Sequence, residues 1–268
     1  MLSPMARSAA VYGTAVLVLA REPRAGRVKT RLCPPLTGER AAAFHQAFVR
    51  DTLESLLGGL GQDLGQDLGQ DLGQDDATVT LAATTDDATD ATDATDAADA
   101  ADAAPVLTEM AREYGVQIAP QGDGDLGDRM WRLAQFGLTY ARRVVLLGSD
   151  SPHMPIRRLR EAIDALSTSD VVLGPSEDGG YYLVGLTAAH RAVFPIDTQW
   201  GGDGVLASTI SSLDRAEISY ALLESGWDVD RGDDLVRLKR ELRAGLIEAP
   251  LRHSRALFSN ADEQGAEF

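Results

Sequence analysis

The stretch Arg143–Pro155, R-V-V-L-L-G-S-D-S-P-H-M-P, restricts the fold of this chain more than any other part of it. Val144–Leu147 are apolar without alternation, which is the pattern of a strand buried on both faces in the middle of an α/β sheet. Gly148 ends this strand, and Asp150 follows just past its carboxyl end, where open α/β sheets bind their ligands. The sequence therefore predicts an α/β protein with Asp150 in its ligand site.

Asp150 has two interpretations at this position. Magnesium and manganese favour one or two protein carboxylates together with substrate phosphates, so Asp150 is a candidate anchor for a nucleotide-bound metal. The alternative is a structural role, in which Asp150 caps the helix that follows the loop. The residues alone leave both interpretations open.

Composition excludes several kinds of partner. The chain has 268 residues, of which 44% are hydrophobic, enough for one large α/β domain or two small ones. Its formal net charge is −16, but twelve aspartates lie in residues 61–104, which contain no Lys, Arg or Glu, and the rest of the chain carries −4. A mildly acidic protein without a basic face is not expected to bind nucleic acid or an anionic membrane.

The cellular location follows from cysteine content and hydropathy. The single cysteine, Cys33, excludes an intramolecular disulfide and fits a reducing compartment. The apolar run Ala15–Ala20 is followed by Arg21-Glu22-Pro23-Arg24 in place of a cleavage site, and no run approaches the roughly eighteen apolar residues of a membrane span. We expect a cytoplasmic protein.

Hydrophobic periodicity predicts alternating strands and helices. The expected strands are 14–20, 77–84, 116–120, 144–147, 171–174, 181–186 and 218–223, and the expected helices are 37–57, 105–114, a helix ending near 140, 156–166, a helix ending near 213 and one ending near 243. Low-complexity acidic inserts at about 61–76 and 86–104 are interpreted as loops, because a glycine in each G-Q-D-L repeat costs a helix about 1 kcal/mol. We interpret residues 14–245 as one domain and 246–268 as a tail.

A basic loop follows the first strand. It carries five cations within eleven residues, Arg21, Arg24, Arg27, Lys29 and Arg31, with Gly26 among them to let a ligand approach the backbone. At the carboxyl end of a strand such a loop predicts a cradle for a polyphosphate. A solvated basic loop without a ligand is the alternative.

Three further segments combine acidic residues with glycines or tyrosines. In G-D-G-D-L-G, Gly127 and the two earlier glycines would let a ligand approach the backbone, or would form a turn before a helix. Asp178-Gly179-Gly180 has the chemistry of a hairpin turn, and Tyr181 beside it is a candidate for a pocket wall. Asp228 and Asp230 flank Val229 at an expected strand end, where either could join Asp150 on a metal.

Five motifs follow one another along the chain: K-T-R-L, G-S-D-S-P, G-P-S-E-D-G-G-Y-Y-L, W-G-G-D-G and D-V-D-x-x-x-D-L. As an ordered set they resemble an uncharacterised bacterial family of glycosyltransferase A-type transferases, the radical S-adenosylmethionine-associated transferases. The resemblance runs from about Val16 to Leu238. It implies a Rossmann-like, three-layer α/β/α fold with a mixed sheet, the nucleotide-diphospho-sugar transferase fold. Molybdenum cofactor guanylyltransferases share that fold.

The resemblance also implies roles for residues. Lys29 and Arg31 would grip phosphates, with Arg21, Gly26 and Gly127 beside them, and Lys29 would act in catalysis. Asp150 and Asp230 would hold Mg²⁺ or Mn²⁺. Asp178 would act in catalysis and face the second substrate together with Gly179, Gly180 and Tyr181.

The implied activity is metal-dependent transfer from a nucleotide-activated donor to a small-molecule acceptor. Glycosyl transfer from a nucleotide sugar is expected first. Nucleotidyl transfer that releases pyrophosphate is the alternative, and a non-catalytic nucleotide-binding protein is the second alternative.

Overall fold

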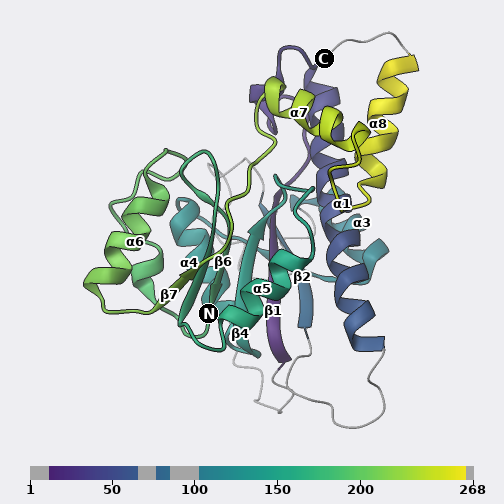
Figure 1. Cartoon of the computed structure of the whole chain (residues 1–268). Coiled ribbons are helices and arrows are strands. Elements are labelled where there is room, and N and C mark those ends of the chain that lie inside the picture. Colours follow the sequence, from purple (N-terminus) through teal and green to yellow (C-terminus); the bar gives the residue numbers. More distant parts are fainter. Residues whose placement is uncertain (1–11, 66–76, 85–102, 264–268) are drawn as a thin grey trace.

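The protein is built around a seven-stranded sheet, which lies between helices in Figure 1. The computed structural model describes residues 12–65, 77–84 and 103–263. In spatial order the strands are β3 (Gln117–Pro120), β2 (Ala77–Thr84), β1 (Tyr12–Arg21), β4 (Ala141–Gly148), β6 (Tyr181–Leu186), β5 (Val171–Pro175) and β7 (Tyr220–Leu222). Strand β6 alone runs against its neighbours in this sheet, because it pairs antiparallel with both β4 and β5 while the other pairs are parallel.

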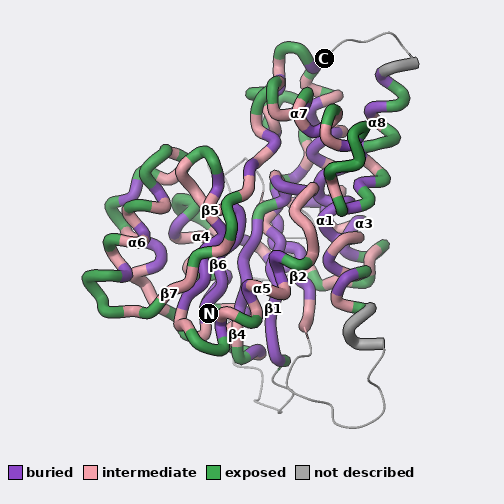
Figure 2. Tube along the Cα trace, in the orientation of Figure 1, coloured by how far each residue is buried: buried purple, intermediate pink, exposed green. Residues whose placement is uncertain are grey.

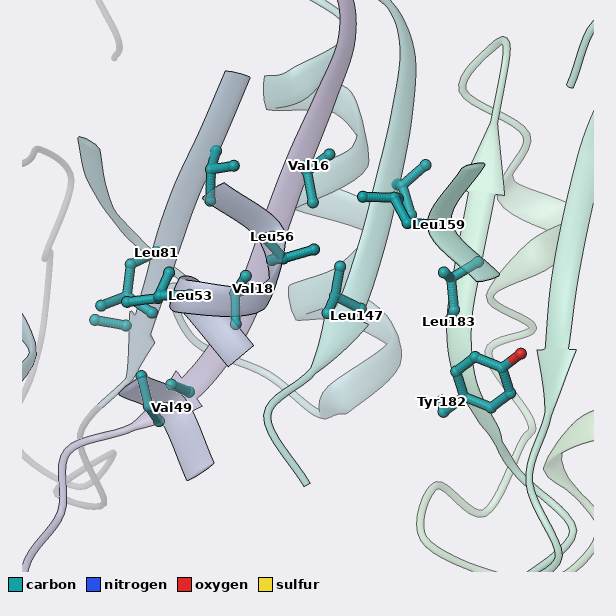
Figure 3. Close-up of a cluster of buried hydrophobic side chains, with 14 of the residues drawn as sticks. Val16, Val18, Val49, Leu53, Leu56, Leu81, Leu147, Leu159, Tyr182 and Leu183 are labelled. Atoms are coloured by element: carbon teal, nitrogen blue, oxygen red, sulfur yellow. The ribbon is translucent and has the colours of Figure 1, made fainter. Parts of the chain in front are cut away.

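Helices cover both faces of this sheet. On one face lie α1 (Gly38–Gly65), α3 (Pro105–Tyr114) and α5 (Arg157–Ala165), and on the other lie α4 (Leu126–Gly137) and α6 (Val205–Arg215). Figure 3 shows the first interface, where Leu53 and Leu56 of α1 and Leu159 of α5 pack on Val16, Val18 and Leu147. Each fully buried leucine or valine stabilises the fold by roughly 1.5–3 kcal/mol. The predicted three-layer α/β/α fold with a mixed sheet is confirmed.

A third hydrophobic cluster lies beyond the sheet. It joins Phe44 and Phe48 in the first half of α1 to α7 (Gly232–Arg243) and α8 (Arg252–Glu263), and the rings of Phe44 and Phe258 lie 5.1 Å apart. Both helices lie beside the same end of α1 in Figure 1, and Figure 2 shows buried residues along the central strands and along the inner side of α1. The segment interpreted as a tail therefore contains a packed helix. The domain boundary at residue 245 stays a prediction.

Most predicted elements are present within a few residues, and the strands 77–84 and 181–186 and the helix 105–114 have the predicted bounds. The loop predicted for 61–76 is wrong at its start, because α1 continues to Gly65. Extending an existing helix needs no new nucleus, which offsets the low helix propensity of glycine. The insert predicted at about 86–104 ends next to α3, which begins at Pro105 as predicted, and Ala104 before it is buried. The remainder of both inserts lies outside the described residues.

Within the described parts of the chain, no helix is both long enough and apolar enough to span a membrane.

Candidate active site

A pocket of about 740 Å³ opens at the edge of the sheet where β1, β2 and β4 end. Its wall contains five cationic side chains and five carboxylates. The cations are Arg21, Arg27, Lys29, Arg31 and Arg129, and the carboxylates are Asp125, Asp150, Asp178, Asp228 and Asp230. The pocket therefore presents both charges at the edge of the sheet that the sequence predicts for ligands.

The position of Asp150 is fixed by hydrogen bonds to a distant segment. Its carbonyl oxygen accepts from Val229 N at 2.8 Å, and the neighbouring Ser151 hydroxyl donates to Trp227 O at 2.8 Å. Helix α5 begins at Arg157, seven residues after Asp150, and its N-cap residue is Ile156. Asp150 therefore does not cap this helix, and its side chain, 46% exposed, faces the pocket.

Lys29 lies behind the two carboxylates that the sequence predicts as metal ligands. It has left-handed backbone angles, φ 49° and ψ 37°, at the start of the 3-10 turn Thr30–Leu32. Its ammonium group lies 2.8 Å from Asp150 Oδ1, 3.7 Å from Asp230 Oδ1 and 2.7 Å from Val229 O. The side chain is only 4% exposed. Lys29 therefore brings together carboxylates that come from opposite ends of the chain.

Arg31 makes the other ion pair of this group. Its Nη1 lies 2.7 Å from Asp230 Oδ2, and its side chain is 62% exposed. Of the five cations in the predicted basic loop, all but Arg24 line the pocket. Arg24 donates to Ala103 O at 3.2 Å, just before α3.

The pocket shifts the pKa of two carboxyl groups in opposite directions. Burial acts to raise the pKa of Asp150, but the Lys29 ammonium, together with His45 and Arg21, outweighs it and holds the pKa below its ordinary value. Burial raises the pKa of Asp228, with the nearby Asp150 charge adding to this effect and the Ser151 and Ser176 hydroxyls opposing it. Asp150 is therefore the more readily ionised of the two.

The expected strand end at Asp228 and Asp230 is wrong, because β7 ends at Leu222 and the chain then makes one isolated bridge, at Gly226. Asp228 accepts hydrogen bonds from the hydroxyls of Ser151 and Ser176, the latter at 2.9 Å. Asp230 pairs with Arg31. The two aspartates thus have different partners, and Asp230 is the one that meets Asp150 through Lys29.

Asp178 also lines the pocket, from the turn that joins β5 to β6. Its Oδ1 accepts from Gly180 N at 2.9 Å, and Ser176 N donates to Gly180 O at 3.0 Å, so the predicted turn is present. Asp178, Gly180 and Tyr181 all line the pocket. Because β6 runs against its neighbours, its amino end brings these residues to the edge where β4 ends.

Three predicted glycines lie outside the pocket wall and pack other segments. A Cβ atom on Gly127 would lie 2.4 Å from the Trp200 indole, and one on Gly179, at φ +87°, would lie 2.0 Å from Asp203 O. Gly26, at φ +73°, lies against Gly38 at the start of α1. Gly127 and Gly179 each permit a close approach of two segments, whereas Gly26 provides a left-handed backbone angle.

Three further residues of the wall are absent from the predicted site. Trp200 belongs to the W-G-G-D-G segment and lines the pocket. Gln121 directly follows β3 and donates to Ala20 O at 3.1 Å and Ala82 O at 2.8 Å. His45 is 4% exposed, and its Nε2 lies 3.0 Å from Arg21 O. Burial lowers the pKa of His45, which keeps its ring neutral near pH 7.

A second group of possible metal ligands among the described residues contains Asp51, Glu54 and His253, none of which lines the pocket. Asp51 is 1% exposed and accepts from His253 N at 2.9 Å, Ser254 N at 3.0 Å and the Ser254 hydroxyl at 2.5 Å. These donors lie in the first turn of α8, so Asp51 of α1 caps that helix. Capping explains the position of Asp51, and His253 Nε2 lies 3.0 Å from Glu54 Oε1.

A protein-family model matches half of the chain. Residues 68–202 match the family model described as an uncharacterized protein conserved in bacteria (DUF2064). The chain belongs to the DUF2064 family. The resemblance to an uncharacterised bacterial family is thereby confirmed, and no curated protein matches the sequence.

Solved structures similar to this DUF2064 chain share its fold. A provisionally named nucleotide-diphospho-sugar transferase from Desulfovibrio desulfuricans G20 is 25% identical, with a TM-score of 0.70, and the match covers 94% of this chain and 96% of that one. A cytidylyltransferase from Leptospira borgpetersenii serovar Hardjo-bovis is 12% identical, with a TM-score of 0.51 over 95% of each chain. A 4-diphosphocytidyl-2C-methyl-D-erythritol synthase from Anaerococcus prevotii is 9% identical, with a TM-score of 0.52 over 87% of this chain and 99% of that one.

Proposed function

We propose that this protein is a metal-dependent transferase that uses a nucleotide-activated donor. The proposal is carried by the meeting of Asp150, Asp230 and the basic loop in one pocket at the carboxyl ends of the strands. The name of the D. desulfuricans relative, with nearly complete coverage of both chains, supports the same class.

The donor atoms of the pocket suit a hard divalent cation. Carboxylate oxygens of Asp150 and Asp230 lie within 3.7 Å of a single point, the Lys29 nitrogen, and the side chains are 46% and 39% exposed. Oxygen ligands from one or two carboxylates, completed by substrate phosphates, are what Mg²⁺ and Mn²⁺ prefer. When bound, such an ion would stabilise negative charge on the departing phosphate group.

The remaining roles follow from the contacts of each side chain. Arg21, Arg27 and Arg31 are exposed on the pocket wall and would bind the donor phosphates, for which a guanidinium provides paired N–H donors. Lys29 would position the two carboxylates. Asp178, Gly180 and Tyr181, which also line the pocket, would bind the second substrate.

Glycosyl transfer from a nucleotide sugar is the first candidate reaction, because the similar D. desulfuricans protein carries that class in its name. Nucleotidyl transfer is the second. It is favoured by the four cations of the basic loop on the pocket wall, which could neutralise a triphosphate.

A panel of nucleoside triphosphates and nucleotide sugars, measured by calorimetry with and without Mn²⁺ and followed by mass spectrometry of products, tests the proposal. Release of a nucleoside diphosphate would identify glycosyl transfer, and release of pyrophosphate would identify nucleotidyl transfer. Binding without turnover across a wide range of acceptors would favour a non-catalytic nucleotide-binding protein. Failure of every nucleotide to bind would overturn the proposal.

A further inference from the structure

Both oxygens of Asp230 already face a cation of the protein. Asp230 Oδ2 lies 2.7 Å from Arg31 Nη1, and Oδ1 lies 3.7 Å from Lys29 Nζ. For Asp150, the ion pair with Lys29 uses Oδ1. A divalent cation that takes an oxygen from both carboxylates must therefore compete with a cation of the protein, most directly at Asp230.

The two competing cations are held very differently. The Lys29 ammonium has three N–H donors and faces three acceptors, Asp150, Asp230 and the carbonyl of Val229, and its side chain is 4% exposed. The Arg31 side chain is 62% exposed. An exposed ion pair contributes little to stability, so Arg31 can leave Asp230 at little cost, whereas Lys29 cannot leave its buried position as easily.

Arg31 also has a better partner available once a donor binds. Its guanidinium projects from the basic loop at the pocket, and a phosphate group offers it two parallel, charge-assisted hydrogen bonds. A phosphate bound there would draw Arg31 away from Asp230.

We propose that Arg31 gates the metal site: it blocks Asp230 while the pocket lacks a phosphate, and it releases Asp230 when it moves onto the phosphates of the donor. The inference rests on the proposed function, because it takes Asp150 and Asp230 as the metal ligands. Its consequence is that divalent cation and nucleotide bind cooperatively. By linkage, each raises the affinity of the protein for the other by the same factor.

The direct test measures Mn²⁺ binding to the full chain in the absence of any nucleotide, by electron paramagnetic resonance of the free ion. Arg31→Gln removes the competitor and should tighten Mn²⁺ binding by about two- to fivefold, the value of one exposed ion pair. Mn²⁺ bound to the Asp150→Asn protein is subtracted, since the twelve aspartates of residues 61–104 also offer carboxylates.

Arg27→Gln is the matched control. Arg27 is an exposed arginine of the same loop and lines the same pocket, but none of the ion pairs described for Asp230 includes it. It should leave Mn²⁺ affinity almost unchanged. Equal tightening in both variants would show a general effect of charge and overturn the gate. Weaker Mn²⁺ binding by Arg31→Gln would overturn it too, because Arg31 would then be holding Asp230 in place for the ion.

Measurements with UDP and GDP separate failure of the gate from failure of the proposed function. If neither nucleotide enables the wild-type protein to bind Mn²⁺ at the Asp150-dependent site, both the metal role and the gate are wrong. If a nucleotide does so, but Arg31→Gln binds Mn²⁺ alone no more tightly than wild type, the gate alone is wrong.

Discussion

Two groups of possible metal ligands in this protein differ in the exposure and the partners of their carboxylates. One is the pair Asp150 and Asp230, and the other contains Asp51, Glu54 and His253. Asp51 is 1% exposed, and its oxygens accept from two backbone N–H groups and one hydroxyl of α8. The Asp150 side chain is 46% exposed, and its partner is a lysine ammonium. Each carboxylate is well satisfied, but by a different kind of donor.

This difference separates structural carboxylates from candidate ligands in the same chain. The donors of Asp51 belong to a helix end, which would lose its cap if the carboxylate moved to another partner. The partners of Asp150 and Asp230 are side-chain cations at the wall of a pocket, where a ligand can replace them. The kind of partner and the exposure of the group therefore say more about function than the residue type does.

The largest expected effect comes from Asp150→Asn. The variant keeps the shape of the side chain but removes the charge that a divalent cation requires. Turnover in whichever transfer reaction the nucleotide panel identifies should fall by about a hundredfold or more, because lost electrostatic stabilisation of the transition state is typically of that size. The melting temperature should fall only modestly, because Lys29 keeps Asp230 and the Val229 carbonyl as partners. Turnover equal to that of the wild type would place Asp150 with the structural carboxylates.

Asp51→Ala should have the opposite profile. It leaves three donors at the start of α8 without their acceptor, and we expect a loss of about 3 kcal/mol in the free energy of unfolding, measured by urea titration. Nucleotide affinity should be unchanged. Glu54→Ala is the matched control, because Glu54 is 26% exposed and should cost less. A large loss of nucleotide affinity in Asp51→Ala would break the contrast between the two sites.

The pKa values of Asp51 and Asp150 should also depart from the ordinary value in opposite directions. Burial raises the pKa of Asp51, whereas Lys29 overcomes burial and lowers the pKa of Asp150. The stability contributed by ionised Asp150 is therefore present above its unfolded pKa and is lost as pH falls through its folded pKa. For Asp51 the sign is reversed: its protonated form favours the fold, and that contribution is lost as pH rises through its folded pKa.

Carbon-13 NMR of the side-chain carboxyl groups would measure this order. As pH is lowered, Asp51 should take its proton before Asp150. In Lys29→Met the pKa of Asp150 should rise above its wild-type value, while that of Asp51 stays the same. The reverse order of protonation would show that the surroundings of the two groups have been misinterpreted.

The smallest expected effect is that of added metal ions on the group Asp51, Glu54 and His253, where we expect no change in stability. In the Asp150→Asn background, added Mn²⁺ or Zn²⁺ should not raise the melting temperature through Asp51, Glu54 and His253, because Asp51 is buried and three donors of α8 already hold its carboxylate. A rise that His253→Gln abolishes would show that these residues bind metal, and would make the two groups alike.

The sequence was sufficient to predict those parts of the fold that depend on local pattern. The unbroken apolar run Val144–Leu147 predicted a central strand, and it lies between β1 and β6. The same run placed Asp150 at the edge of the sheet, where the pocket lies. Turn chemistry likewise predicted the hairpin at Asp178-Gly179-Gly180.

The missing parts depend on contacts between distant residues. Helix α8 has Leu251, with φ 44°, at its start, and the capping carboxylate comes from Asp51, 203 residues before Ser254. Glu22, near the start of the basic loop, is buried because its carboxylate accepts from Val106 N and Leu107 N at the start of α3. Arg31 and Asp230 are 199 positions apart in the sequence, so no local sequence pattern predicts their ion pair.

The hydrogen bond from Lys29 to Val229 spans 200 residues and has a consequence for how the protein is made. During synthesis the amino-terminal basic loop emerges first, but the carboxylate and carbonyl that hold Lys29 emerge only after most of the chain. A nascent chain that ends before residue 228 has no partner for Lys29 at Val229 and no Asp230, so it lacks one wall of the pocket. The ribosome therefore releases the cations of this site long before the site itself can exist, and the capacity to bind a donor should be among the last properties that the growing chain acquires.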